Sequence, residues 1–161
     1  MRIVLPVAFF FAISACATAP DNTRFYLLSD TTSSSSECPV SIGRVVLPGY
    51  LNRANIVVKS AEHRLTPATN HRWSEPLDEA SRRLLGACMN ADAKEIADVT
   101  IQHFHGNTTG ETVLEATWQL RSVDKVNRFN QQRQQATSGY DALVATQQLL
   151  LLDLCATICT N

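Results

Sequence analysis

Residues 96–120, IADVTIQHFHGNTTGETVLEATWQL, contain the clearest pattern in the chain. From Ile96 the apolar residues follow a period of two, which places Val99 and Ile101 on one face of a strand. A glycine-bounded turn follows at residues 106–110. Strict alternation with polar residues then resumes, the apolar members being Leu114, Ala116, Trp118 and Leu120. The stretch therefore predicts a half-buried β-hairpin.

Shorter segments on both sides extend this pattern. Residues 25–28, 40–47 and 56–58 predict strands, with residues 63–66 as a hairpin partner of the third, and residues 126–135 predict an edge strand. Helical spacing of apolar residues predicts helices at about 76–90, with Pro76 in the first turn, and 139–159. The expected order is β-β-β-α-β-β-(β)-α. We expect one α/β domain, with α+β as the alternative, built from a mixed sheet of about five to six strands and two main helices.

The second expected helix contains four consecutive leucines at residues 149–152. Consecutive helical residues point about 100° apart, so one face cannot bury all four. No Lys or Arg follows Arg133 to solvate an exposed side. Two expectations stay open: the helix is enclosed within the subunit, or its outer face meets a partner or a second copy in a homo-oligomer.

The composition of the chain excludes several classes of function. The chain has 161 residues, 45% of them hydrophobic, with 14 Lys and Arg against 15 Asp and Glu and a formal net charge of −1. This length and composition suit one globular domain. Because no basic excess is available to neutralise phosphates, we expect no nucleic-acid partner. No run of about 20 apolar residues occurs, so we expect no membrane-spanning helix.

The amino terminus predicts export and lipid attachment. Arg2 precedes eleven apolar residues, 3–13, which is the length of a secretory hydrophobic region. Ile13-Ser14-Ala15-Cys16 resembles the bacterial lipobox, which makes Cys16 the acylated first residue of the mature chain. The alternative is an ordinary signal peptide that leaves Cys16 free. Residues 1–15 are thus the expected signal peptide, 16–23 a lipidated tether and 24–161 the folded domain. Since Ala17 is not Asp, the resemblance implies the periplasmic face of the outer membrane.

Four cysteines remain after Cys16, an even number for an oxidising compartment. Cys155 and Cys159 lie one helical turn apart, where the helix geometry disfavours a bond between them. Among the pairings, we expect a Cys38–Cys88 disulfide. The alternative is that Cys88 is a small buried hydrophobic residue.

Recognisable catalytic chemistry is missing from the sequence. No nucleophile elbow, zinc-protease or phosphate-loop motif occurs, and we expect no enzyme activity, no metal and no cofactor. His103 and His105 would share one strand face but lack a third ligand, so we interpret them as solvent-facing. Glu111 and Glu115 fall on the polar side of the alternation and predict a solvated face.

Several segments resemble the ABC-type transport auxiliary lipoprotein family. Residues 25–28, FYLL, match its first-strand pattern; residues 46–53, VLPGYLNR, resemble its V-x-x-P-x-Y-L segment; and residues 71–77, HRWSEPL, resemble its W-x-x-P-L segment. Trp118 and then Tyr140 with Leu143 continue the resemblance. The matches run in order along nearly all of residues 25–158.

The resemblance implies a non-catalytic subunit of a system in which MCE-domain proteins connect the two membranes and carry lipid. It implies an MCE-domain protein as partner and the outer membrane as the surface held by the acyl chains on Cys16. We expect partner contacts at Tyr50, Leu51, Trp73, Pro76 and Leu77, because Tyr50 and Trp73 stand beside turn residues. The alternative is that these aromatic residues close the core. Two other functional classes are a stand-alone structural lipoprotein of the outer membrane and an anchored hydrolase.

Overall fold

The computed structural model describes residues 21–29 and 37–160. The expected signal peptide, Cys16 and most of the tether lie outside these residues. Within these described residues, seven strands and two helices form one domain, which confirms the α/β expectation with slightly more strands than predicted. The elements are β1 (Arg24–Tyr26), β2 (Val40–Val46), β3 (Asn55–Ala61), β4 (Arg64–Trp73), α1 (Leu77–Cys88), β5 (Glu95–Asn107), β6 (Glu111–Leu120), β7 (Val126–Gln134) and α2 (Tyr140–Cys159).

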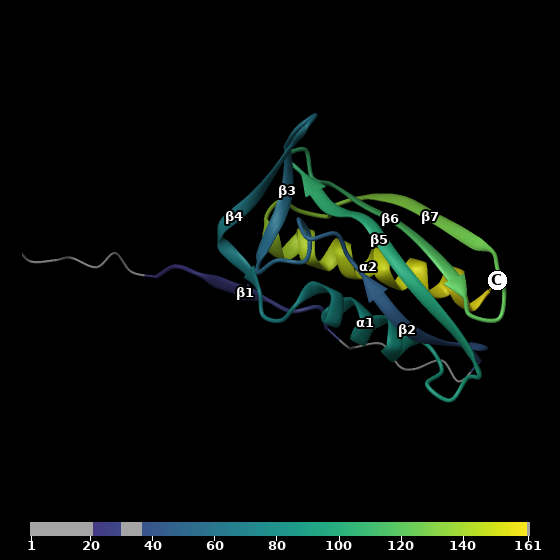
Figure 1. Ribbon diagram of the computed structural model, residues 1–161. Helices are drawn as coiled ribbons and strands as arrows, with labels where there is room; N and C mark the ends of the chain where they lie inside the picture. Colours follow the sequence, from purple (N-terminus) through teal and green to yellow (C-terminus); the bar gives the residue numbers. More distant parts are fainter. Residues whose placement is uncertain (1–20, 30–36, 161) are drawn as a thin grey trace, which may run out of the picture.

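The sheet is mixed, with the strand order β1-β4-β3-β5-β6-β7. The β3–β4, β5–β6 and β6–β7 pairs are antiparallel, whereas β1–β4, β3–β5 and β2–β5 are parallel. The strict alternation in β6 matches its burial, because Thr112, Leu114, Ala116 and Trp118 face inward. Figure 1 shows β5, β6 and β7 as long neighbouring strands, with α1 and α2 packed behind the sheet.

One side of β5 has two successive partners with a space between them. β2 pairs with β5 as far as Thr100, and β3 pairs with it from Gly106. Among the strands that the structure describes, none pairs with residues 101–105 of β5 on that side. Backbone carbonyls in this stretch need other hydrogen-bond donors, since an unpaired buried carbonyl is costly.

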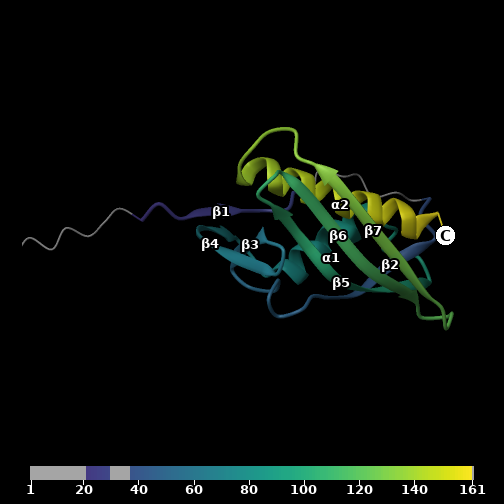
Figure 2. The same ribbon diagram turned by 90° about the horizontal axis from the view of Figure 1, so that it is seen from above.

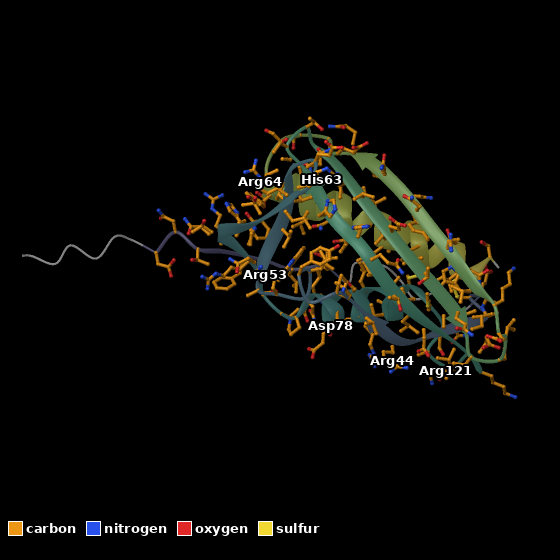
Figure 3. All side chains as sticks on the ribbon, turned by 45° about the horizontal axis from the view of Figure 1, so that its top comes forward. Arg44, Arg53, His63, Arg64, Asp78 and Arg121 are labelled. Atoms are coloured by element: carbon orange, nitrogen blue, oxygen red, sulfur yellow. A yellow bond between two sulfur atoms is a disulfide. The ribbon has the colours of Figure 1, made fainter. Side chains whose placement is uncertain are left out.

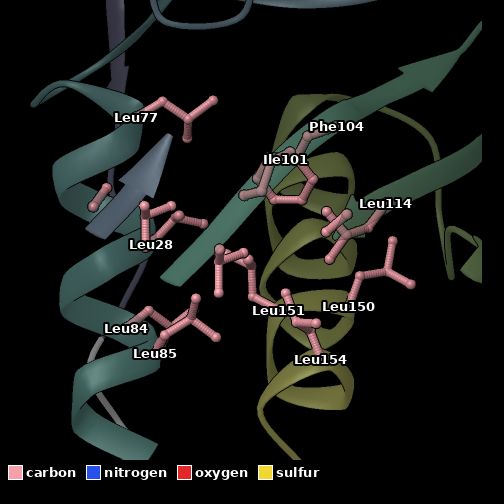
Figure 4. Close-up of a cluster of buried hydrophobic side chains, with 14 of the residues drawn as sticks. Leu28, Leu77, Leu84, Leu85, Ile101, Phe104, Leu114, Leu150, Leu151 and Leu154 are labelled. Carbon is pink, nitrogen blue, oxygen red and sulfur yellow. The ribbon is translucent and has the colours of Figure 1, made fainter. Parts of the chain in front are cut away.

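The core lies between the sheet and the two helices. Figure 4 shows leucines of α1 and α2 meeting Ile101 and Phe104 of β5 and Leu114 of β6. Within α2, Leu150 and Leu151 are fully buried, Leu152 is half-buried and Leu149 is 45% exposed. The leucine run is therefore mostly enclosed by the subunit, and Leu149 carries its main exposed surface.

By length and hydropathy alone, α2 meets the criteria for a membrane span. Core helices of folded domains meet the same criteria when their apolar faces are buried. Half of the most apolar stretch of α2 is buried inside the domain, against β5, β6, β7 and α1. We therefore describe α2 as the central core helix (Figure 2).

The predicted Cys38–Cys88 disulfide is wrong. Cys38 bonds to Cys159, with Cα atoms 4.9 Å apart, and Cys88 bonds to Cys155, with Cα atoms 6.6 Å apart. The C-terminal end of α2 lies beside both the last turn of α1 and the start of β2. Successive turns of α2 thus present one cysteine to each neighbour. Sequence spacing could not show this, because the pairing depends on how distant elements pack.

Candidate partner-contact site

Two loops meet beside the space between β2 and β3. Residues 48–53 form a tight turn in which the backbone N–H groups of Leu51 and Asn52 donate to the Pro48 carbonyl at 2.9 and 3.0 Å. The second loop connects β4 to α1, and the N–H of Trp73, the last residue of β4, donates to the carbonyl of Ala54 at 2.7 Å. All five residues predicted to contact a partner lie in these loops or at the strand and helix ends that border them.

Tyr50 fills the space between the strands. Its hydroxyl donates to the Gln102 carbonyl of β5 at 2.6 Å and lies 3.2 Å from Nδ1 of His103. Burial raises the pKa of the Tyr50 phenol, and the nearby Glu115 carboxylate raises this pKa further. The hydroxyl therefore stays protonated and available as a donor over the ordinary pH range.

The carbonyl of Phe104, two residues further along β5, also has a side-chain donor. Nε2 of Gln147, a buried residue of α2, lies 3.3 Å from this oxygen. Side chains from a turn and a helix thus replace the missing strand partners of Gln102 and Phe104. Tyr50, the tyrosine of residues 46–53, therefore has a structural role, because its hydroxyl supplies the donor for the Gln102 carbonyl.

The remaining predicted contact residues divide into buried and exposed ones. Leu51, Trp73 and Leu77 are only 1%, 5% and 1% exposed, so they belong to the core beneath the loops. Pro76 is exposed and occupies the N-cap position of α1, which begins one residue later than predicted. Only Tyr50, half-buried, and Pro76 offer appreciable side-chain surface to another molecule.

An open groove lies between the two loops. Its cavity of about 440 Å³ is lined by Asn52, Arg53, Ala54, Trp73, Ser74, Glu75 and Pro76. Oε1 of Glu75 pairs with Nη2 of Arg83 at 2.5 Å, and the same guanidinium nitrogen donates to the Leu28 carbonyl at 3.0 Å. The wall on this side is therefore fixed to α1 and to the segment after β1. The polar wall residues were not predicted from the sequence, because isolated Asn, Arg and Glu residues in loops carry no pattern.

His103 and His105 share a strand face as predicted, with ring centroids 5.8 Å apart. Their exposure differs, because His105 is 8% exposed while His103 is an exposed residue. Burial lowers the pKa of His105, and the neighbouring His103 lowers this pKa further. The prediction of a solvated pair is therefore wrong for His105. Glu115 lies beside the exposed His103, 3.8 Å away. Within the described residues, no three His, Cys, Asp or Glu side chains are arranged to hold a metal ion.

Known proteins are similar to this chain over the same segments that form the sheet, the helices and the two loops. A model of the ABC-type transport auxiliary lipoprotein component family matches residues 26–97 and 93–159. The two ranges together span both loops, both helices and almost the whole described sheet.

The chain belongs to this family. Curated relatives with similar sequences are the proteins named intermembrane transport lipoprotein PqiC in Escherichia coli and in Shigella flexneri. Each is 22% identical over 153 residues, covering 82% of either chain.

Solved structures share the fold of this family member. An uncharacterized protein has a TM-score of 0.75 at 22% identity, covering 86% of this chain and 97% of its own. A protein from Xanthomonas campestris has a TM-score of 0.64 at 12% identity, covering 84% and 92%. At these identities the likeness concerns the fold alone.

Proposed function

We propose that this chain is a non-catalytic lipoprotein subunit of an MCE-type intermembrane lipid transport system. The observation that carries the proposal is the family match along residues 26–159. The relatives named intermembrane transport lipoprotein PqiC add the type of system. The role we infer is to hold the outer end of a lipid conduit and so support envelope integrity.

Residues 1–15 act in this proposal as a lipoprotein signal peptide. Cys16 carries the acyl chains that bind the periplasmic face of the outer membrane, and residues 16–23 tether the domain that starts at residue 24. Two disulfides use all four cysteines of the described chain. They support an oxidising compartment such as the periplasm.

The groove between the two loops is the proposed contact for an MCE-domain protein. Arg53 and Pro76 are exposed on its walls, while the buried Trp73 and Leu77 hold the loops rigidly. A rigid, partly apolar groove suits recognition because little conformational entropy is lost on binding. In this arrangement Leu51, Trp73 and Leu77 position the contact surface, and Tyr50 and Pro76 touch the partner.

Copurification tests the proposal. Tagged, acylated wild-type protein is extracted from the envelope in mild detergent, and copurifying proteins are identified by mass spectrometry. We expect an MCE-domain protein with the wild type and a large loss of it with Arg53→Glu/Pro76→Asp. The matched control is Lys125→Glu/Val126→Asp at the distant start of β7, which should retain the partner.

Three results contradict this proposal at different levels. Absence of any MCE-domain protein would favour a stand-alone structural lipoprotein. Retention of the partner by the groove variant would place the contact elsewhere. A mass of the amino-terminal peptide that lacks acyl chains on Cys16 would remove the anchor.

A further inference from the structure

Two large hydrophobic side chains are exposed where the folded domain begins. Phe25 is 65% exposed and Leu27 is 53% exposed, whereas Tyr26 and Leu28 between and after them are 8% and 0% exposed. This alternation is that of an extended chain with one buried and one open side. Phe25 and Leu27 therefore lie on the same open side.

The segment that presents this pair is firmly held. Tyr26 aligns with Trp73 of β4, and its hydroxyl lies 2.7 Å from Nδ1 of His71. Just beyond the strand, the Leu28 carbonyl accepts a hydrogen bond from Arg83. Phe25 and Leu27 are thus displayed by a fixed backbone and are not part of a loosely attached tail.

The strands around Phe25 are basic. Within β1, β3 and β4 the charged residues are Arg24, Lys59, Arg64 and Arg72, and none is an Asp or Glu. Arg72 aligns directly with Phe25 across the parallel β1–β4 pair. The carboxylate of Asp21 lies close enough for Arg72 to contribute to its lowered pKa, after the larger effect of the Thr23 hydrogen bonds. Figure 3 shows Arg53 and Arg64 on the same end of the molecule as β1.

The same end lies nearest to the proposed anchor. Phe25 lies nine positions after Cys16, and an extended chain spans at most about 3.6 Å per residue, or about 30 Å in all. β1 projects from the body on this side, remote from the turn between β6 and β7 (Figure 1). Any bilayer that holds Cys16 is therefore within reach of Phe25.

We propose that the β1 end of the domain docks onto the phospholipid surface that carries the anchor, with Phe25 and Leu27 inserted at the interface and Arg72, the β4 partner of Phe25, facing lipid phosphates. An apolar pair beside basic residues is the usual composition of interfacial docking surfaces. The inference rests on the lipid anchor proposed above. Docking would fix the orientation of the body and hence the direction in which the groove of residues 52–54 and 73–76 faces.

Quenching by brominated phospholipid measures this contact. Full-length acylated Phe25→Trp protein is reconstituted into phosphatidylethanolamine and phosphatidylglycerol vesicles, with and without bromine on the acyl chains. The native Trp73 and Trp118 are buried, and wild-type protein supplies their background. We expect about a twofold loss of the emission from the indole introduced at residue 25, because a docked apolar side chain lies about 5–10 Å into the interface.

The matched control is Val126→Trp, at a similarly exposed hydrophobic residue on β7. The anchor holds both variants on the same vesicles, but the indole introduced at residue 126 should keep nearly all of its emission. Arg72→Gln in the Phe25→Trp background should reduce quenching most on vesicles rich in phosphatidylglycerol. Arg128→Gln, the matched control on β7, should leave it unchanged.

Mass spectrometry of the amino-terminal peptide separates two kinds of failure. An unacylated Cys16 would contradict the anchor and the proposed function. Acylated Phe25→Trp protein whose introduced indole is unquenched, or is quenched only as much as that of Val126→Trp, would overturn the docking inference alone. If Phe25→Ser/Leu27→Ser instead lowers the molecular mass of a detergent-purified assembly and the Phe25→Trp variant is unquenched, the surface is a protein interface and the inference is also wrong.

Discussion

The hydroxyl of Tyr50 lies 2.6 Å from the carbonyl oxygen of Gln102 and completes a sheet that its strands leave incomplete. β2 and β3 both run parallel to β5, but neither covers residues 101–105. A turn side chain thus replaces a strand at this position. The turn also forms one wall of the groove, so the stability of the sheet and the shape of the proposed partner site are linked.

Tyr50→Phe should lower the free energy of unfolding by about 1–3 kcal/mol, because the Gln102 carbonyl loses its donor while staying partly buried. Urea denaturation followed by circular dichroism measures the change. Tyr140→Phe is the control: Tyr140 is also half-buried, but its hydroxyl has no hydrogen-bond partner within the described residues. Equal effects of the two substitutions would contradict the role of the Tyr50 hydroxyl.

Single cysteine substitutions should reveal the disulfide pairing. Cys159→Ser should free the thiol of Cys38, and Cys155→Ser should free that of Cys88. Alkylation of the denatured, unreduced protein followed by peptide mass spectrometry identifies the free thiol. A free Cys88 in the Cys159→Ser variant would contradict the pairing.

Removal of the disulfides should also cost stability. Cys38 and Cys159 are 121 residues apart, so chain entropy predicts a loss of about 5 kcal/mol for Cys38→Ala/Cys159→Ala. For Cys88→Ala/Cys155→Ala, with a separation of 67 residues, the corresponding loss is about 4 kcal/mol. The two losses should not add, because each bond shortens the loop that the other closes. Urea denaturation of both double variants and of the quadruple variant tests this expectation.

Gly43→Ala should destabilise the domain by about 1–3 kcal/mol through overpacking. A Cβ atom at residue 43 would collide with Oδ1 of Asp98 and lie 2.8 Å from Cγ2 of Ile96. Gly49→Ala is the matched control, since a Cβ there meets no atom within 4 Å. Thermal unfolding compares the two, and a Gly43→Ala variant as stable as Gly49→Ala would contradict the close approach of β2 to Asp98.

Asp98 should make stability depend on pH in the acid range. Its pKa is lowered from the ordinary 3.8, first by the Arg121 hydrogen bonds and then by the backbone N–H of Arg44. A lowered folded-state pKa means that the stabilisation is present above the unfolded pKa and is lost as the pH falls through the folded pKa. The stability difference between wild type and Asp98→Asn should therefore shrink below about pH 4.

The exposed carboxylate of Glu79 provides the control for this measurement. Its side chain has no hydrogen-bond partner among the described residues, so Glu79→Gln should change stability less than Asp98→Asn does at neutral pH. Urea denaturation at a series of pH values follows both variants. A constant difference between wild type and Asp98→Asn across the series would contradict the assignment.

Much of the local structure could be predicted because it depends on short-range periodicity. The hairpin of β5 and β6 follows from alternation, and the predicted helices at 76–90 and 139–159 correspond to Leu77–Cys88 and Tyr140–Cys159. The predicted strand at residues 63–66 was too short, since β4 continues to Trp73. Most residues of β4 are exposed, so the sequence after residue 66 has no alternating apolar pattern from which the rest of the strand could be predicted. The burial of His105 could not be foreseen, because it depends on how distant elements such as β3 pack at this end of β5.

Local patterns along the chain were enough to predict the fold class, the two helices, the central hairpin and the family, because these depend on periodic burial and on short segments in a fixed order. Three further features follow from the packing of distant elements: which cysteines bond, the burial of Leu51, Trp73 and Leu77 in the core, and the hydrogen bond by which Tyr50 completes the sheet. Each of these depends on contacts between residues far apart in the chain. Such contacts are set by how the helices pack on the sheet, and no local pattern encodes them.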